Sequence, residues 1–393
     1  MSAEYQSNHY VPQWYQRQFI DPERSDQELY LLDLKPGSFK DGKGRRHRHR
    51  ALRVTGTKHC FAIDDLYATR LRGSTSRELE RVFFGDIDDR GRKAVKFFAG
   101  YEHDRMRQNV LDDLMLFMST QKLRTPKGLD WLVDASGATK REDVLRHVVR
   151  MQSLYGAIWT ECVWQIADAS ASPTKFIVSD HPVTVYNKAC TSNNPLYCKG
   201  PRDPDIRMNA THTLFPLCAD RLLILTNLAW ACAPYRSPME FRVNPELQRG
   251  AMFNFLEVQV RRQLDEHEVR EVNFVLKRRA YQFIAAGREE WLYPERHVQQ
   301  HWRDLGGGHL LMPDPRSLTP GAEYMMGYSD GSTHGMDTFG RLPEHAEFGQ
   351  ESRSGSEHEL HRRWRSEFEQ RHGPSRRGMC FDDMPTRPTT PST

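Results

Sequence analysis

The strongest candidates for chemistry are polar residues at the centres of three short motifs in this 393-residue chain: HYVPQ at 9–13, QKLRTP at 121–126 and FIVSDHPV at 176–183. A histidine can act as a general base or a metal ligand, and an arginine is a permanently charged anchor for phosphate or carboxylate. An aspartate directly after a buried strand commonly faces a cleft. The predicted catalytic residues are His9, Gln13, Gln121, Arg124 and Asp180, with Ser179 as a binding residue.

Each of these residues also has a structural alternative, because polar networks inside proteins often hold the fold together. His9 could bond a backbone carbonyl and fix the N-terminal segment. Arg124 and Asp180 could form a buried ion pair, and the Ser-Asp-x-Pro segment could be a turn stabilised by its own side chains. The sequence leaves both interpretations open.

Two acidic residues extend the candidate site toward a metal. Glu80 and Asp88 stand eight positions apart in a predicted helix, which is close to two turns, so both side chains can face one side. With His9 and Asp180 they would form a hard-metal or acid/base cluster, and the predicted cofactor is a divalent cation. The alternative is a solvated helix face.

A basic loop at 36–50 is the predicted contact for phosphate groups. It joins two predicted strands, 28–34 and 51–63. A solvated loop is the alternative. The predicted binding residues are Arg45, Arg46, Arg48 and Arg50.

Hydrophobic periodicity predicts the helices and strands that must position these residues. One predicted helix begins near Thr75, and two more span 104–121 and 140–155. A fourth begins at Asn244-Pro245, and the last one ends near Gly287. The segment 157–168 is predicted as a strand, with a strongly amphipathic helix as the alternative. The other predicted strands form a hairpin over 160–179 and a pair around Asp220. Near the N-terminus, the apolar residues that should anchor the chain to the helical core are Tyr10, Val11, Tyr15 and Phe19.

These elements predict an α+β class with a mainly helical core and a small antiparallel sheet formed by N-terminal and central strands. Residues 1–70 and 71–305 form the main domain. Residues 306–393, rich in glycine, proline, serine and charge, are predicted to be a mostly disordered tail with one helix near 356–372. Leu360, Trp364 and Phe368 form the apolar stripe of that helix.

The composition sets limits on compartment and partners. The formal net charge is only +4, so attraction to nucleic acid must come from local patches. The seven cysteines show no paired spacing, no stretch resembles a signal peptide, and no apolar run is long enough to cross a bilayer. We expect a cytoplasmic protein without membrane contact. Motifs of nucleotide-binding loops, serine hydrolases and zinc proteases are absent from the sequence.

The three motifs, in this order and spacing, resemble those of domain of unknown function 4238, the HYVPQ family of uncharacterised, mainly bacterial proteins. Phe215-Pro216-Leu217 resembles a short strand of that family, and Asn273 with Ala280 resembles its closing helix. The resemblance covers about residues 8–290. It implies an outline of the fold and no activity.

Two hypotheses of function follow. In the first, the chain is a nuclease-like or phosphodiesterase-like hydrolase acting on nucleic acid or nucleotides, as a bacterial defence or toxin effector. His9 is then a base or metal ligand, Asp180 and Glu80 are metal or acid/base groups, and Arg124 holds phosphate. In the second, it is a non-catalytic binding or sensor module whose polar motifs form a structural network and whose tail helix binds a protein partner.

Overall fold

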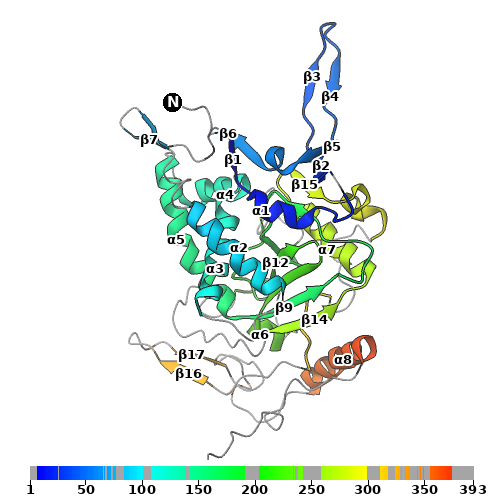
Figure 1. The fold of residues 1–393 in the computed structure, drawn as a ribbon. Helices are drawn as coiled ribbons and strands as arrows, with labels where there is room; N and C mark the ends of the chain where they lie inside the picture. Colours follow the sequence, from blue (N-terminus) through cyan, green and yellow to red (C-terminus); the bar gives the residue numbers. More distant parts are fainter. Residues whose placement is uncertain are drawn as a thin grey trace, which may run out of the picture.

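A computed structural model of the chain shows a mixed α+β protein (Figure 1). The α+β class predicted from the sequence is therefore confirmed. The structure describes residues 7–24, 26–64, 66, 69–71, 74–76, 84–100, 108–137, 141–190, 203–232, 234, 238–241, 258–298, 310–316, 324–327, 331, 333–336, 343, 346, 348 and 355–373.

A five-stranded sheet lies inside the body, with the strand order β11-β12-β13-β9-β14. Neighbouring strands are antiparallel, except that β14 runs parallel to β9. Leu223 and Leu225 of β13 belong to one core cluster, and Leu222 and Ile224 belong to another. Because alternate side chains of a strand point to opposite faces, both faces of this sheet are covered. The strands are β9 (Cys162–Asp168), β11 (Thr184–Asn187), β12 (Thr211–Cys218), β13 (Arg221–Asn227) and β14 (Gln259–Gln263).

Helices cover one face of this sheet (Figure 1). Phe98 of α2 packs against Trp164 of β9 with ring centroids 5.6 Å apart, and Phe117 of α3 lies 6.2 Å from Phe215 of β12. These large rings join the helical layer to the sheet and bury much apolar area. The helices of this part are α2 (Gly85–Ala99), α3 (Gln108–Arg124), α4 (Pro126–Ser136) and α5 (Arg141–Thr160), and α6 (Leu228–Cys232) follows β13.

The opposite face packs against α7 (Glu266–Arg279). Val269 and Val272 of this helix belong to the same buried cluster as Leu222 of β13 and Ile284 of a second sheet. That second sheet is antiparallel, with the order β10-β15-β2-β5. Its strands are β2 (Glu28–Asp33), β5 (Leu52–Gly56), β10 (Val178–Ser179) and β15 (Phe283–Ala286).

The N-terminal segment is anchored as the sequence predicts. Tyr10, Val11, Tyr15 and Phe19 are all buried. The ring of Tyr15 stacks on Phe215 at 5.5 Å, and its hydroxyl donates to the carbonyl of the next residue of β12. The segment comprises β1 (Ser7–His9), α1 (Gln13–Gln16) and the 3-10 turn η1 (Arg17–Phe19); β1 pairs with β6 (Ala62–Asp64), which follows the turn η2 (Thr57–His59).

Several expected elements are confirmed and others are corrected. The strands around Asp220 and the strand pair β2–β5 are confirmed. The prediction of a hairpin over 160–179 is wrong, because β9 and β10 belong to different sheets. A helix does not begin at Thr75, where strand β8 (Ser74–Ser76) pairs with β7 (Thr69–Leu71). In each case tertiary pairing overrides the local pattern.

The boundaries of the last helices also change. The helix expected up to Gly287 ends at Arg279, and the final apolar residues form β15. The last residues of the helix predicted from Asn244-Pro245 form strand β14 instead. The predicted start of that helix lies outside the described residues. The loop at 36–50 contains a short hairpin, β3 (Ser38–Lys40) with β4 (Arg46–Arg48), and helix α4 follows α3 where the sequence analysis expected none.

The predicted tail helix is confirmed as α8 (Gly355–His372), and it packs against the rest of the chain. Trp364 and Phe368 are buried with Met312 and partly buried Trp230. The guanidinium of Arg262 on β14 lies 5.1 Å from the ring centroid of Phe368. The other described elements after α7 are η6 (Glu289–Leu292), η7 (Pro294–Arg296), β16 (Tyr324–Gly327) and β17 (Thr333–Met336). The predicted mostly disordered tail, 306–393, also includes the buried residues 310–312 and the strands β16 and β17; the rest of that prediction, apart from α8 and a few other residues, lies outside the described ranges.

No helix in the described ranges is both long and apolar enough to cross a membrane.

A close approach of backbone atoms fixes α4 against the end of α3. Thr125 caps α4 by accepting the N–H of Gly128, and Pro126 stands in the first turn. A Cβ atom on Gly128 would lie 2.3 Å from the carbonyl oxygen of Lys122 and 2.7 Å from that of Leu123. These are backbone atoms, so no side-chain movement can relieve the overlap.

We therefore expect Gly128→Ala to lower the free energy of unfolding by about 2 kcal/mol or more, through backbone displacement. Gly156→Ala is the matched control, because Gly156 also lies within a helix and a Cβ there meets nothing within 4 Å. That variant should gain about 0.5–1 kcal/mol. Urea denaturation measures both, and equal effects of the two substitutions would contradict this account of the α3–α4 junction.

Candidate functional site

The two polar residues of the N-terminal motif bind neighbouring backbone and side chains. Nε2 of His9 lies 3.0 Å from the carbonyl oxygen of Lys58. Partial burial lowers the pKa of His9, so its ring is neutral at pH 7. The side-chain oxygen of Gln13 accepts from the hydroxyl of Thr57 at 3.3 Å and from Arg17 at 3.4 Å. Both residues thus connect the chain start to residues 57–58.

Gln121, Arg124 and Asp88 form a second group, which we call the Arg124 cluster. Nε2 of Gln121 donates to the carbonyl of Tyr10 at 2.7 Å, and its oxygen accepts both Nε and Nη2 of Arg124 at 3.0 and 2.6 Å. Nη2 of Arg124 also binds Oδ1 of Asp88 at 2.7 Å. Arg124 is only 1% exposed, and its guanidinium lies 5.6 Å from the ring centroid of Phe84. The Arg124 cluster therefore joins α2, α3 and the N-terminal segment.

The predicted metal site does not take shape among the described residues. Asp88 is the ion-pair partner of Arg124, and Glu80 lies outside the described ranges. Burial raises the pKa of Asp88, and Arg124 opposes this shift. In the part of the chain that the structure describes, no group of three or more His, Cys, Asp or Glu side chains is arranged to hold a metal ion. A metal role for Glu80 and Asp88 stays a prediction.

Asp180 and Ser179 occupy the end of β10, away from the Arg124 cluster. Oδ1 of Asp180 accepts the N–H of Tyr281 at 2.8 Å, and Oδ2 accepts the N–H groups of Gln282 and Phe283 at 2.6 and 2.8 Å. Burial raises the pKa of Asp180 to about 6, against these three donors, so the carboxylate is ionised at pH 7. Oγ of Ser179 accepts the N–H of His181 at 3.2 Å. This geometry is the turn that the sequence analysis kept as the alternative.

The predicted residues therefore lie in separate places. The structure brings Gln121, Arg124 and Asp88 together, and it places Asp180 against the start of β15. His9 and Gln13 contact residues 57–58. The four predicted phosphate-binding arginines lie on the exposed hairpin β3–β4 and its flanks.

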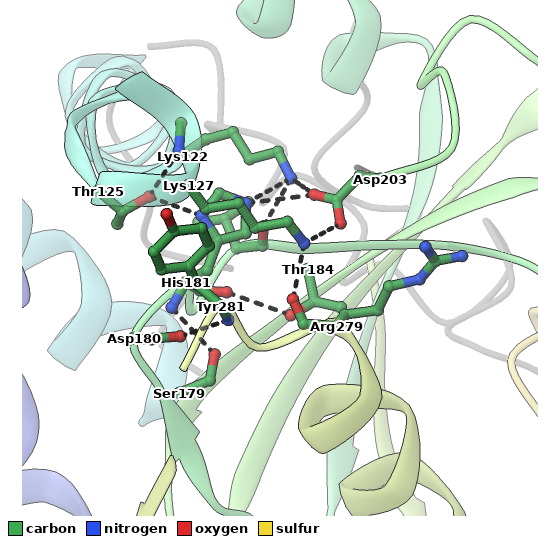
Figure 2. A network of polar contacts seen from close by, with 12 residues as sticks. Lys122, Thr125, Lys127, Ser179, Asp180, His181, Thr184, Asp203, Arg279 and Tyr281 are labelled. Carbon is green, nitrogen blue, oxygen red and sulfur yellow. Dashed lines mark hydrogen bonds and ion pairs between the residues drawn. The ribbon is translucent and has the colours of Figure 1, made fainter. Parts of the chain in front are cut away.

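A cavity of about 860 Å³ opens beside Asp180. Its wall is formed by the end of α3, by α4, by α5, by residues 203–207 and by Tyr281. Its buried end holds four side chains that the sequence analysis did not select, which we call the lysine cluster (Figure 2). They are Lys122, Lys127, His181 and Asp203.

The two lysines of this cluster share one carboxylate. Nζ of Lys127 lies 2.6 Å from Oδ1 of Asp203, and Nζ of Lys122 binds Oδ2 (Figure 2). Lys122 also donates to the carbonyl of Val183 at 3.1 Å, and Lys127 to that of Arg279 at 2.7 Å. The lysine side chains are only 7% and 6% exposed. Such burial of two ammonium groups is costly unless they are paired and hydrogen-bonded, and here they are both.

His181 completes the lysine cluster. Its Nδ1 lies 2.6 Å from Oγ1 of Thr125, and its Nε2 lies 3.2 Å from Oδ2 of Asp203 and 2.9 Å from Nζ of Lys122. Both nitrogens of the neutral ring therefore have hydrogen-bond partners.

Burial and mutual charge tune the protonation of the lysine cluster. Burial lowers the pKa of Lys122 to about 8 and of His181 to about 3, and it also lowers the pKa of Lys127. The nearby cations hold the pKa of Asp203 well below its usual range, although burial opposes them. At neutral pH the histidine is therefore neutral and Asp203 ionised, while the amine of Lys122 can gain or lose a proton near pH 8.

The outer part of the cavity has a different chemistry. Asp130 and Asp134 of α4 are exposed there, and the hydroxyl of Tyr281 donates to Asp130 at 2.6 Å. Trp131 adds an aromatic face there, and the buried Tyr155 adds one nearer to Asp203. The cavity thus has the paired lysines at its buried end, and the exposed Lys35, carboxylates and rings toward solvent.

Three of the four residues of the lysine cluster lie in or directly beside the same motifs as the predicted catalytic residues. Lys122 follows Gln121, Lys127 follows the Thr125-Pro126 step, and His181 follows Asp180. All three motifs were recognised as polar, but spacing alone did not show which members face the cavity. Asp203 lies outside all three motifs, between β11 and β12, and no pattern in the sequence marks it.

Comparisons of this chain with protein-family models, with curated proteins and with solved structures find no match. The resemblance to the HYVPQ family therefore stays a prediction.

Asp180 gives a direct test of the turn that borders the cavity. Asp180→Asn turns one acceptor into an N–H₂ group facing a backbone donor, so we expect a loss of about 2 kcal/mol in the free energy of unfolding at pH 7.5. Asp64→Asn is the control, because Asp64 is exposed on β6; its effect should stay within about 0.5 kcal/mol. Equal losses of unfolding free energy in the two variants would contradict the structural role of Asp180.

The same pair of variants predicts a pH dependence. The folded pKa of Asp180, about 6, lies above the unfolded value, so the folded state binds this proton more tightly. The stability of the wild type relative to Asp180→Asn should therefore rise as pH falls from about 6 toward 4. Urea denaturation at pH 4.5, 6 and 7.5 measures the trend, and a flat difference would contradict it.

Proposed function

We propose that the protein is an enzyme that binds a small anionic substrate of nucleotide size in this cavity. Lys122 and Lys127 hold its phosphate or carboxylate group, and Lys122 exchanges a proton with it. The observation that carries the proposal is that two buried lysine amines share the single carboxylate of Asp203 in the wall of a large cavity.

The charges around the lysines favour an anion. The pKa values of both lysines respond to Asp203 and Arg279, and that of Lys127 also responds to Asp180. The two lysine cations thus share one carboxylate in a region of low dielectric, where an incoming anion is attracted more strongly than at the surface. Asp180 is already bound by three backbone N–H groups, which leaves Asp203 as the carboxylate that an anionic ligand would compete with.

Size and lining support a nucleotide-like substrate. A volume of about 860 Å³ is within the range of small-molecule sites. The rings of Trp131, Tyr155 and Tyr281 supply faces for a planar group, and the carboxylates of Asp130 and Asp134 can accept hydrogen bonds from hydroxyl groups. The sequence-based expectation of a nucleotide substrate is kept, while its residues move from the predicted set to the lysine cluster.

The amine of Lys122 supports a chemical role. A group with a pKa of about 8 can donate or accept a proton near neutral pH, and Nε2 of His181 lies only 2.9 Å away. The alternative of a non-catalytic module rests on a free tail helix. Trp364 and Phe368 of that helix are buried against Met312 and Trp230 of the same chain, which does not favour that alternative.

Calorimetric titration with nucleoside mono-, di- and triphosphates tests the proposal. Lys127→Met should weaken binding about tenfold or more, equivalent to about 1.4 kcal/mol. Lys93→Met, on an exposed position of α2, is the matched control and should bind like the wild type. Asp203→Asn removes the competing carboxylate and should tighten binding several-fold, a gain that misfolding cannot imitate. No binding by the wild type, or equal effects of the two lysine variants, would refute the site.

The protonation of Lys122 predicts how binding depends on pH. Its ammonium form attracts the anion, so affinity should fall as pH rises through about 8. Lys122→Arg keeps the charge at all these pH values and should move the loss of affinity above pH 9. Titrations between pH 6.5 and 9.5 measure both curves. An unchanged midpoint in the arginine variant would show that another group controls binding.

A further inference from the structure

The hairpin β3–β4 projects from the body (Figure 1). None of its residues lines the cavity. Its register pairs Ser38 with Arg48, Phe39 with His47, and Lys40 with Arg46. All six residues are exposed. A pair of strands this short is marginally stable by itself, so its order needs additional contacts.

Those contacts lie at the turn of the hairpin. Oδ1 of Asp41 accepts the N–H groups of Lys43 and Arg45 at 2.9 and 2.8 Å, and Oδ2 binds Nε2 of His47 at 2.8 Å. The bond to His47 holds the pKa of Asp41 below its ordinary value. Gly44 adopts the positive φ of 77° that the turn requires. The hairpin is therefore built as a preorganised structure, which lowers the entropic cost of binding a partner.

The two faces of the hairpin differ in chemistry. Because side chains alternate along a strand, Lys40, Arg46 and Arg48 share one face. On the other face the ring of Phe39 lies 5.5 Å from that of His47 and 5.0 Å from that of His49. The hairpin thus has a cationic face and an aromatic face.

The charge of the chain is concentrated here. Residues 38–50 carry six basic side chains and one acidic side chain, a formal charge of +5, while the whole chain carries +4. All of the positive excess of the protein therefore lies in this projection. Such a local field attracts polyanions at long range although the overall charge is small.

We propose that the hairpin β3–β4 binds double-stranded DNA by entering its major groove. A two-stranded ribbon fits this groove, which is about 12 Å wide, and phosphates line both of its walls. The major groove of an RNA duplex is too narrow for side chains to read. A lipid surface is disfavoured, since Phe39 is the one large apolar side chain of residues 38–50. The cations of the hairpin contact phosphates, and the alternating faces meet the two walls.

Fluorescence anisotropy with a labelled DNA duplex of about 20 base pairs, two turns of the helix, tests this proposal. The full chain should bind with an affinity that falls steeply as salt rises. Arg46→Gln with Arg48→Gln should weaken binding about tenfold and reduce the slope of log affinity against log salt by about two, one for each lost phosphate contact. Both positions are exposed, so the fold of the body should be unaffected; within the hairpin, the substitution at Arg46 removes its 2.8 Å bond to Oγ of Ser38.

The matched control is Arg92→Gln with Lys93→Gln, which removes the same charge from exposed positions of α2. It should leave affinity within about twofold of the wild type and the salt slope unchanged. Duplex RNA, single-stranded DNA and vesicles with anionic lipid are measured in parallel. Equal weakening by both double variants, tighter binding to any of these other polyanions, or no DNA binding would each overturn the proposal. The nucleotide titration of the cavity is independent of every one of these outcomes.

Discussion

The carboxylate of Asp180 fixes the geometry on which the cavity depends. It is an ionised group in the protein interior, and it is tolerated there because three successive backbone N–H groups, from Tyr281 to Phe283, donate to it. These bonds set where β10 ends and where β15 begins. They also fix the next residue, His181, within contact of Lys122 and Asp203, and they hold Tyr281 in the cavity wall. A residue that looks catalytic in the sequence thus supports the site by shaping the backbone.

The end of α3 serves both structure and function. Gln121 and Arg124 point to the N-terminal segment and α2, whereas Lys122 points to the cavity. Successive residues of a helix differ by about 100° in direction, so neighbours in one motif can serve opposite sides. The Arg124 cluster holds this helix end in place from one side, and the contact of Gly128 with the backbone of Lys122 holds it from the other. The lysine amines are therefore placed by a rigid support.

Much of the fold was predictable from local signals. The stop of α3 at Thr125-Pro126, the strands around Asp220 and the apolar anchors of the N-terminus depend on nearby residues, and the structure agrees with them. The separation of β9 and β10 into two sheets was not predictable, because their partners come from β13 and β15, far along the chain. The residues of the lysine cluster were not predictable for the same reason, because their partners are distant in the sequence. The motifs were visible as polar segments, but only the packed structure shows that Asp203 meets Lys122 and Lys127.

The stacking of Tyr15 on Phe215 has a consequence for how the chain folds during synthesis. Two hundred positions separate these partners, and Asp21 and Asp33 likewise bind Arg288 and Gln282, near the end of the described body. The N-terminal segment is translated long before β12, so Tyr15 can contact Phe117 of α3 earlier but gains its stacking partner only when β12 has been made. A topology of such high contact order folds slowly, and it leaves apolar surface exposed to aggregation in the meantime. The N-terminal segment can therefore be buried completely only after the second half of the protein has been translated.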